Sequence, residues 1–223
     1  VSSLSDHSQP ITILSRRCLV MVLFRVKLAR IHLIKIYSRF KHSGCRRGQN
    51  SGKMKTQKET EMIGQVLLEG LGLGVLLVLV CAVGIRKGAV GMVHLYHEDV
   101  QERCVKLGLT TREKIRRNSL LFKACCLPGY IAYVLVCVYA VNGARGFWPG
   151  FWPLLVILFI MNLIERFLID EWWVGHTKAW TIPGTEDLKP YITGADKRKK
   201  WIAGTISLAV ISAVLAGIAA LIV

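Results

Sequence analysis

Four long apolar blocks, separated by charged segments, restrict the fold of this chain more than any other feature. The blocks are residues 63–85, 120–141, 151–169 and 201–223. Each is close to the about 20 residues that an α-helix needs to cross the ~30 Å hydrocarbon core of a bilayer. Inside that core every backbone polar group must bond within its own segment, so helices are the expected form. The sequence therefore predicts an all-α integral membrane protein with four transmembrane helices.

The charged segments between the blocks predict the orientation. Segment 86–117 holds eight Lys and Arg residues and segment 170–200 holds six, whereas segment 142–150 holds only Arg145. Short segments rich in Lys and Arg stay on the cytoplasmic side of a membrane. We therefore expect loops 86–117 and 170–200 to be cytoplasmic, and both ends of the chain to lie outside.

The first of these loops is long enough to have helical structure of its own. We expect one helix over Gly91–Leu107, stopped by Gly108. Thr110 and Glu113 have the spacing of a capping box. In this motif the first residue is the N-cap, and the side chain of the third residue after it accepts a hydrogen bond from the backbone N–H of the N-cap. A second helix is therefore expected to start there and to continue into the second apolar block.

Residues 1–53 differ from the rest of the chain in charge. They hold 11 Lys and Arg residues and one acidic residue, whereas residues 54–223 hold 19 and 13. With the N-terminus outside, this basic segment would lie on the wrong side of the membrane. We therefore predict that 1–53 is a non-native or disordered basic extension, that the native chain starts at Met54 or Met62, and that 54–223 form the transmembrane domain.

The expected partners follow from the same distribution of charge. Basic residues in membrane proteins more often set the topology and contact anionic lipid head groups than bind nucleic acid. We therefore expect the lipid bilayer as the partner of the basic residues, and argue against nucleic acid. A second copy of the chain, forming a homo-oligomer, or another membrane protein is the expected protein partner.

The end of the third block holds the densest group of polar and aromatic side chains. Ionisable groups within a span are costly, so they usually face the bundle interior and pair. Arg166 is expected to pair with Asp170, one turn later, or with Glu69 from the first block. In the alternative interpretation, Trp172 marks the lipid interface, where Arg and Glu side chains need no ligand. The candidate functional cluster comprises Asn162, Glu165, Arg166, Asp170, Trp173, His176, Glu186 and Asp187.

Two other places in the sequence are candidate sites. Glu69 is an isolated carboxylate in the first block, and such a group needs a partner or a proton. His94, His97 and Glu98 share one helical face and are a weak candidate metal site, since the run lacks the H-E-x-x-H order of a zinc hydrolase. The seven Cys residues show no C-x-x-C spacing, which argues against a zinc or redox site.

Small residues at helical spacing predict how the spans pack. Gly70 and Gly74 in the first block, and Ala209, Ala213 and Gly217 in the fourth, would each allow a close approach between helices. We therefore expect the first and fourth spans to pack tightly, within one chain or between subunits.

The segment from Asp170 to Tyr191 resembles the signature of a known family. An Asp at the end of a span is followed by Trp173, His176 and the run Ile182–Asp187, with the sequence I-P-G-T-E-D. This pattern is similar to a family of small multi-pass bacterial membrane proteins, mostly from Gram-positive anaerobes, whose members have no assigned activity. The resemblance covers about residues 62–223 and implies a bacterial plasma membrane.

The same run has a physical interpretation beside the resemblance. Pro183 and Gly184 occupy the two central positions that a tight turn favours. Glu186 and Asp187 would then lie at the membrane surface and pair with Lys178 or Lys189.

Three functions remain open at the level of sequence. The first is binding of a small ligand or partner at the cytoplasmic face, through the candidate cluster. The second is transport of a small molecule or ion along a path near Glu69 and Arg166. The third is a membrane-embedded enzyme that acts on a lipid-soluble substrate through Asp170 and His176. The sequence indicates no cofactor for any of the three.

Overall fold

The computed structural model of the chain describes residues 51–222, with side chains from Glu59 onward. The predicted extension, residues 1–53, lies outside the described residues except for Ser51–Lys53, which begin the first described helix. Every secondary-structure element within residues 51–222 is a helix, as expected from the sequence.

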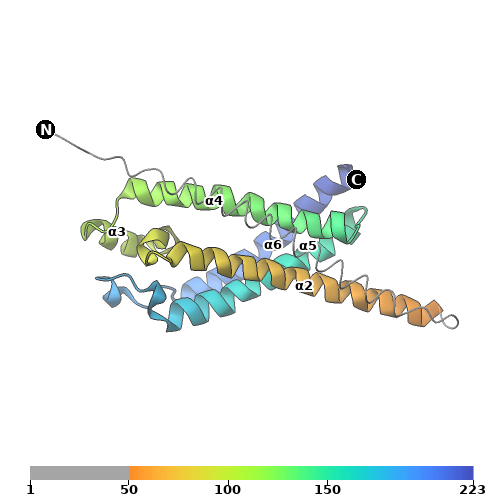
Figure 1. Cartoon of the computed structure of the whole chain (residues 1–223), viewed down its shortest axis with the longest axis horizontal. Coiled ribbons are helices and arrows are strands. Elements are labelled where there is room, and N and C mark those ends of the chain that lie inside the picture. The colour runs from red at the N-terminus through yellow and green to blue at the C-terminus, as the bar shows by residue number, and fades with distance from the viewer. Residues whose placement is uncertain (1–50, 223) are drawn as a thin grey trace. The chain divides into compact units, whose positions relative to one another are not determined.

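Four long helices run through the molecule (Figure 1). They are α2 (Ser51–Ile85), α4 (Arg112–Leu135), α5 (Phe147–Ile164) and α6 (Gly194–Ile222). The helix of α4 continues as the π-helix η2 (Val136–Val141), and that of α5 as the π-helix η3 (Glu165–Val174). All four are long and apolar enough to cross a membrane. The prediction of four apolar helices is therefore confirmed.

The start of α4 differs by one residue from the prediction. The N-cap is Thr111 rather than Thr110, and its hydroxyl oxygen accepts a hydrogen bond of 3.3 Å from the backbone N of Lys114. The capping hydroxyl satisfies one of the backbone N–H groups that the first turn leaves without a partner. Thr110, by contrast, is buried.

Four short helices form a layer at the end of the bundle where α2 ends and α6 begins. The short helices are η1 (Ala89–Leu95), α3 (Glu98–Lys106), η4 (Lys178–Trp180) and η5 (Glu186–Leu188). Together with their connecting loops, residues 86–111 and 175–193, they are named the capping layer below. Its first half comes from the α2–α4 connection and its second half from the α5–α6 connection.

The single helix expected over Gly91–Leu107 is two helices with a break between them. Tyr96 and His97 have extended backbone conformations. The break lets the Tyr96 hydroxyl donate a hydrogen bond of 2.6 Å to the backbone oxygen of Trp180 in the other half of the layer. A long-range contact of this kind has no signal in the local sequence. Gly108 ends α3 as expected, with φ of 69°.

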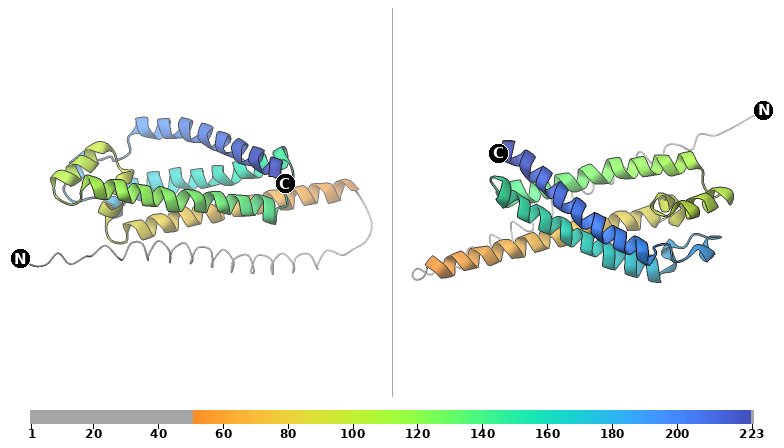
Figure 2. Two further views of the ribbon diagram at one scale, coloured as in Figure 1. Left: turned by 90° about the horizontal axis from the view of Figure 1, so that it is seen from above. Right: turned by 180° about the vertical axis from the view of Figure 1, so that it is seen from behind.

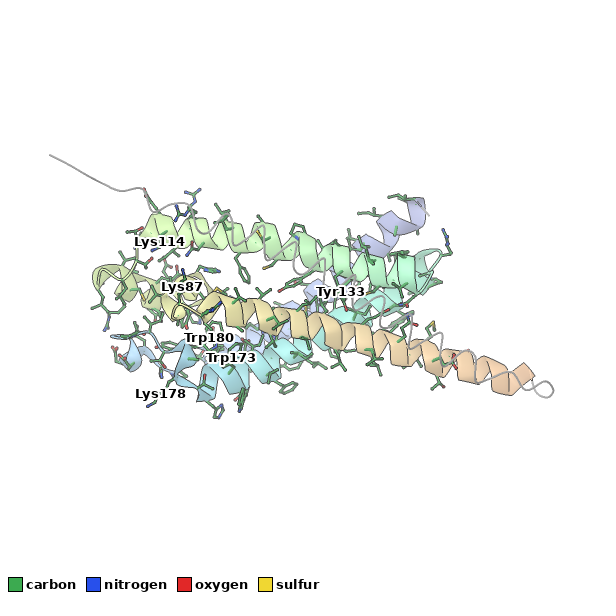
Figure 3. All side chains as sticks on the ribbon, viewed as in Figure 1. Lys87, Lys114, Tyr133, Trp173, Lys178 and Trp180 are labelled. Carbon is green, nitrogen blue, oxygen red and sulfur yellow. The ribbon has the colours of Figure 1, made fainter. Side chains whose placement is uncertain are left out.

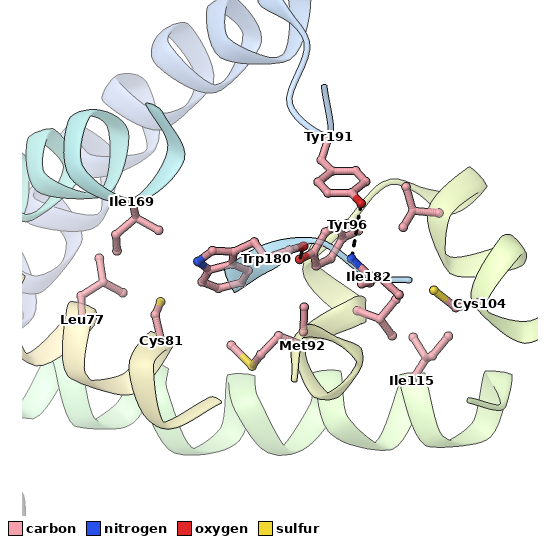
Figure 4. Packing of buried hydrophobic residues seen from close by; sticks show 13 residues of the cluster. Leu77, Cys81, Met92, Tyr96, Cys104, Ile115, Ile169, Trp180, Ile182 and Tyr191 are labelled. Atoms are coloured by element: carbon pink, nitrogen blue, oxygen red, sulfur yellow. Dashed lines mark hydrogen bonds between the residues drawn. The ribbon is translucent and has the colours of Figure 1, made fainter. Parts of the chain in front are cut away.

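An apolar core packs the capping layer on the ends of the long helices and includes three side chains of the family-like segment (Figure 4). Trp180, Ile182 and Tyr191 are buried there beside Tyr96. The predicted turn is confirmed: the backbone N of Thr185 donates to the oxygen of Ile182 at 3.2 Å. Gly184 has φ of 82°, which a type II turn requires at its third position. The run I-P-G-T-E-D therefore shapes a packed corner.

A second apolar core lies between the long helices and includes Leu73, Val134, Leu154 and Ala216. Of the long helices, α5 and α6 make the most extensive contact, and both views in Figure 2 show them adjacent.

The expected pairing of the first and fourth spans through small residues is not present within the chain. A Cβ on Gly70 would lie 2.7 Å from the Cδ1 of Ile160, and a Cβ on Gly74 would collide with Ile164. Gly70 and Gly74 therefore face α5, where branched side chains fill the space that they leave. A Cβ on Gly217 of α6 would meet no atom within 4 Å.

Candidate functional site

The predicted cluster separates into groups that face different parts of the molecule. One group joins the end of α5 and η3 to the start of α6. The Nε of Arg166 donates to the Oδ1 of Asn162 at 3.1 Å, and its Nη1 donates to the Oδ2 of Asp170 at 3.4 Å. Lys200 completes the network, since its Nζ lies 3.1 Å from the same Asp170 oxygen and its backbone oxygen accepts from Arg166 Nη2. The predicted Arg166–Asp170 pair is confirmed.

This ion network is held in a confined space. The side chains of Arg166 and Asp170 are only 10% and 12% exposed. Opposite them, α6 carries Gly204, at which a Cβ would lie 3.0 Å from the Arg166 Nη2. A glycine at this point lets the guanidinium lie against the backbone of α6. The network therefore joins η3 to α6 through one carboxylate and two cations. One polar atom of the group, the Nδ2 of Asn162, is buried and has no hydrogen-bond partner among the described residues.

Trp173, from η3, packs against the capping layer instead. Its ring meets that of Trp180 edge to face, with 5.6 Å between the centroids. Figure 3 shows both rings at the same end of the bundle as the labelled Lys87, Lys114 and Lys178. The role of Trp173 is therefore packing between η3 and η4.

Three other members of the cluster, His176, Glu186 and Asp187, lie at the surface. A ring nitrogen of His176, Nδ1, lies 2.9 Å from the backbone oxygen of Glu171, one turn before it. Asp170 is bound by Arg166 and Lys200, so Asp170 and His176 do not form the joint site that a membrane-embedded enzyme would need.

The predicted partners of Glu186 and Asp187 are wrong. Glu186 accepts a hydrogen bond of 2.8 Å from the backbone N of Gly184, and so supports the turn. Asp187 pairs with Arg103 of α3 at 3.1 Å. Lys189, one of the expected partners, donates to Thr181 instead. The Arg103–Asp187 pair ties α3 to the second half of the capping layer, and only the tertiary fold brings the two together.

Glu69 has close partners and is not isolated. Its two carboxylate oxygens accept hydrogen bonds from Gln65 at 3.3 Å and from Asn142 at 3.0 Å. Gln65 also donates to Asn142 at 2.7 Å, which closes a three-membered polar cluster. The Tyr133 hydroxyl donates to the backbone oxygen of Glu69 at 3.1 Å. The expected alternative, a pair with Arg166, is wrong.

Glu165 adjoins Arg166 in η3 but makes no hydrogen bond or ion pair with the Arg166–Asp170–Lys200 network. It is among the charges that act on the Cys81 thiol of α2 and on the Tyr130 hydroxyl of α4. Among the residues whose side chains the structure describes, none donates a hydrogen bond to its carboxylate. Glu69 and Glu165 thus each lie near a tyrosine of α4, Tyr133 and Tyr130 respectively.

The candidate metal site is not formed. The break at Tyr96 and His97 separates the two histidines: His94 packs on the ring of Phe122, whereas the Nε2 of His97 lies 3.0 Å from the Oδ2 of Asp196. In the part of the chain that the structure describes, no group of three or more His, Cys, Asp or Glu side chains is arranged to hold a metal ion.

His94 instead lines a cavity of about 420 Å³ between α3 and the first three turns of α4. Arg116, Ser119 and Lys123 of α4 form one wall, and Glu98 and Gln101 of α3 belong to the other. This cavity was not predicted from the sequence. Its only local signal is the spacing of Arg116, Ser119 and Lys123, which places them on one helical face.

The electrostatics of this cavity are unusual in two ways. Arg112 pairs with Glu102 at 3.0 Å, but Arg116 and Lys123 have no ion-pair partner within residues 51–222. Both ring nitrogens of His94 are buried and have no hydrogen-bond partner there. Burial, followed by the nearby charge of Lys123, lowers the pKa of His94, so the ring is neutral at pH 7 and offers one donor and one acceptor.

A second cavity, of about 480 Å³, lies beside the His97–Asp196 pair and is lined by Asp99 and Tyr191. His97 already has a partner there.

Comparison of the chain with models of protein families, with curated proteins and with solved structures finds no match.

Proposed function

We propose that this protein is a multi-pass protein of a bacterial plasma membrane that binds a small polar ligand at its cytoplasmic face. The four apolar helices have the length that crossing requires. The basic side chains Lys87, Lys114 and Lys178 lie at the end that carries the capping layer (Figure 3). The loop at the other end, between η2 and α5, has Arg145 as its only Lys or Arg. The positive-inside rule then favours a cytoplasmic capping layer.

The ligand is expected in the cavity between α3 and α4, because His94 lies in its wall with two unsatisfied ring nitrogens. Buried polar atoms normally have hydrogen-bond partners, and an exception needs an explanation. A bound polar ligand supplies both missing partners. This observation carries the proposal, which assigns the ligand to this cavity rather than to the cluster predicted from the sequence.

Filling the cavity tests this function. Ser119→Trp places an indole between Arg116 and Lys123 and is expected to remove a ligand that co-purifies with the full-length protein. Native mass spectrometry of the protein, released from detergent, measures the ligand as an added mass. Leu121→Trp is the matched control, because Leu121 is exposed on α4 and does not line the cavity.

The added mass should persist in Leu121→Trp and be lost in Ser119→Trp. An unchanged added mass in Ser119→Trp, in a protein that remains folded by circular dichroism, would contradict the proposal. His94→Gln provides a milder second variant, which replaces the imidazole ring by an amide on a side chain of similar length.

Transport is a second candidate function, and Glu69 and Glu165 favour it. Ionisable groups in a span commonly mark a path for protons or ions. Glu69 is bound within a polar cluster, whereas Glu165 receives no hydrogen bond from the described residues. Glu165, rather than Arg166, is therefore the expected partner of Glu69 in a path between α2 and α4.

A flux assay tests this second function. Protein in liposomes that contain a pH-sensitive dye should conduct protons in response to a potassium diffusion potential. Glu165→Gln should reduce this flux at least about tenfold, because an amide cannot carry the proton. Glu113→Gln, an exposed acid in the first turn of α4, is the matched control. Equal fluxes in both variants, or no flux above protein-free liposomes, would exclude a proton path through Glu165.

A further inference from the structure

The cations of the cavity between α3 and α4 lie on one face of α4. Arg112, Arg116, Ser119 and Lys123 follow one another at intervals of four, three and four residues, which is the spacing of a single helical stripe. Arg116 and Lys123 are about 10 Å apart along the axis, at 1.5 Å per residue. Their long side chains can both extend to the level of Ser119, which lies between them.

The balance of charge in the cavity favours an anion. Glu102 compensates Arg112 at 3.0 Å. Arg116 and Lys123 remain without an ion-pair partner within residues 51–222, and Glu98 is the one other acid that lines the cavity. An anion of one or two charges placed between Arg116 and Lys123 would therefore compensate charges that the described residues leave unbalanced.

The position of His94 narrows the chemistry of the anion. His94 comes from η1 and packs on α4 through the ring of Phe122, and Lys123 is the charge that acts on its ring. A tetrahedral anion has several oxygens directed to different sides. It can accept hydrogen bonds from Arg116, from Lys123 and from the imidazole N–H of His94, which all line the cavity. The second ring nitrogen, an acceptor, can bind a hydroxyl or ammonium group next to the anion.

We propose that this cavity binds a phosphate group, held by Arg116 and Lys123 of α4 and by His94 of η1. This inference rests on the proposed ligand-binding function and specifies its ligand class. Two sources can present the same chemistry. Leu120 is 60% exposed at the cavity, in the turn where α4 changes from charged to apolar residues, so the acyl chains of a lipid would find an apolar surface there. A soluble phosphate ester would bind without using Leu120.

Two probes and two double variants test this proposal. Full-length protein in a non-ionic detergent is titrated with dihexanoyl phosphatidylglycerol and with glycerol 3-phosphate, and binding is followed by isothermal titration calorimetry. Arg116→Gln with Lys123→Gln removes both cations of the cavity. Lys114→Gln with Arg117→Gln is the matched control: it removes the same charge from the same helix, but neither residue lines the cavity.

The cavity variant should weaken binding at least about tenfold, since it removes two charge-assisted hydrogen bonds. The control variant should change binding less than about twofold, as expected for screened surface charges. Tighter binding of the lipid than of glycerol 3-phosphate would identify a lipid headgroup as the source, and equal binding would identify a soluble phosphate. Equal weakening in the two double variants would overturn the proposal, because it would show that binding follows net charge alone.

Failure of both probes to bind would also overturn the phosphate assignment. The proposed ligand-binding function would fail separately, through the Ser119→Trp experiment. If Ser119→Trp still removes a co-purified mass while neither probe binds, the cavity binds a ligand of another class. If Ser119→Trp changes nothing, the cavity is not the binding site.

Discussion

Replacing Trp180 by alanine is expected to lower the free energy of unfolding by about 3–5 kcal/mol, the range for removing a buried aromatic side chain. Trp180 is 3% exposed. Its ring contacts that of Trp173 at 5.6 Å between centroids and that of Tyr96 at 6.4 Å. The substitution would leave a cavity where the two halves of the capping layer meet. Chemical denaturation of the protein in detergent micelles measures the loss.

Trp172→Ala is the control for this prediction. Trp172 is the neighbour of Trp173 but is 58% exposed, so its removal should cost less than about 1 kcal/mol, as is usual for surface positions. Limited proteolysis adds a local readout. Cleavage in 86–111 and 175–193 should accelerate in Trp180→Ala while the long helices stay protected. A similar loss of stability in the two variants would contradict the role assigned to Trp180.

The second large effect is expected at Arg166. Arg166→Ala leaves Asp170 with Lys200 as its only cation and removes the donor to the Asn162 oxygen. Breaking a buried ion pair by removing one partner costs about 3–5 kcal/mol, because the remaining charge stays buried. Arg198→Ala is the matched control, since Arg198 is exposed on α6 and has no ion-pair partner within residues 51–222. Thermal unfolding in detergent compares the two variants.

A double substitution separates structural from chemical roles at this network. Arg166→Met combined with Asp170→Leu removes both charges and keeps the side-chain volume, and such exchanges are often neutral or stabilising. We expect the double variant to recover most of the stability that Arg166→Ala loses. Ligand binding at the α3–α4 cavity should then be unchanged. A stable double variant that has lost ligand binding would instead show that the network itself belongs to the binding site.

The contacts around Trp180 also affect the geometry of the proposed ligand-binding cavity. α3 forms one wall of the cavity, and its position depends on contacts with the second half of the capping layer. These are the Tyr96–Trp180 hydrogen bond and the Arg103–Asp187 pair. Burial raises the pKa of Tyr96, so its hydroxyl keeps the proton that it donates to Trp180. Trp180→Ala keeps the backbone oxygen that Tyr96 binds but removes the indole that packs beside the Tyr96 ring. It should therefore weaken ligand binding as well as stability.

Local features of the sequence predicted the long helices, one ion pair within them and one turn in the connection between α5 and α6. A run of about 20 apolar residues has one way to satisfy its backbone in an apolar environment. The Arg166–Asp170 pair follows from a spacing of four on one helix. The turn at Pro183 and Gly184 follows from the dihedral angles that these two residues favour. In each case the interacting groups are close in sequence, so the pattern itself carries the information.

Only the tertiary structure decided which polar groups meet. Glu69 bonds to Asn142, at the far end of the next long helix, and Asp187 bonds to Arg103. The break at Tyr96 and His97, which undoes the candidate metal site, exists because a side chain from the α2–α4 connection reaches the α5–α6 connection. The cavity between α3 and α4 likewise forms only because residues of both helices come together in the folded chain. Partners that are far apart in sequence leave no periodic pattern, so only the packing of the helices decides which of them meet.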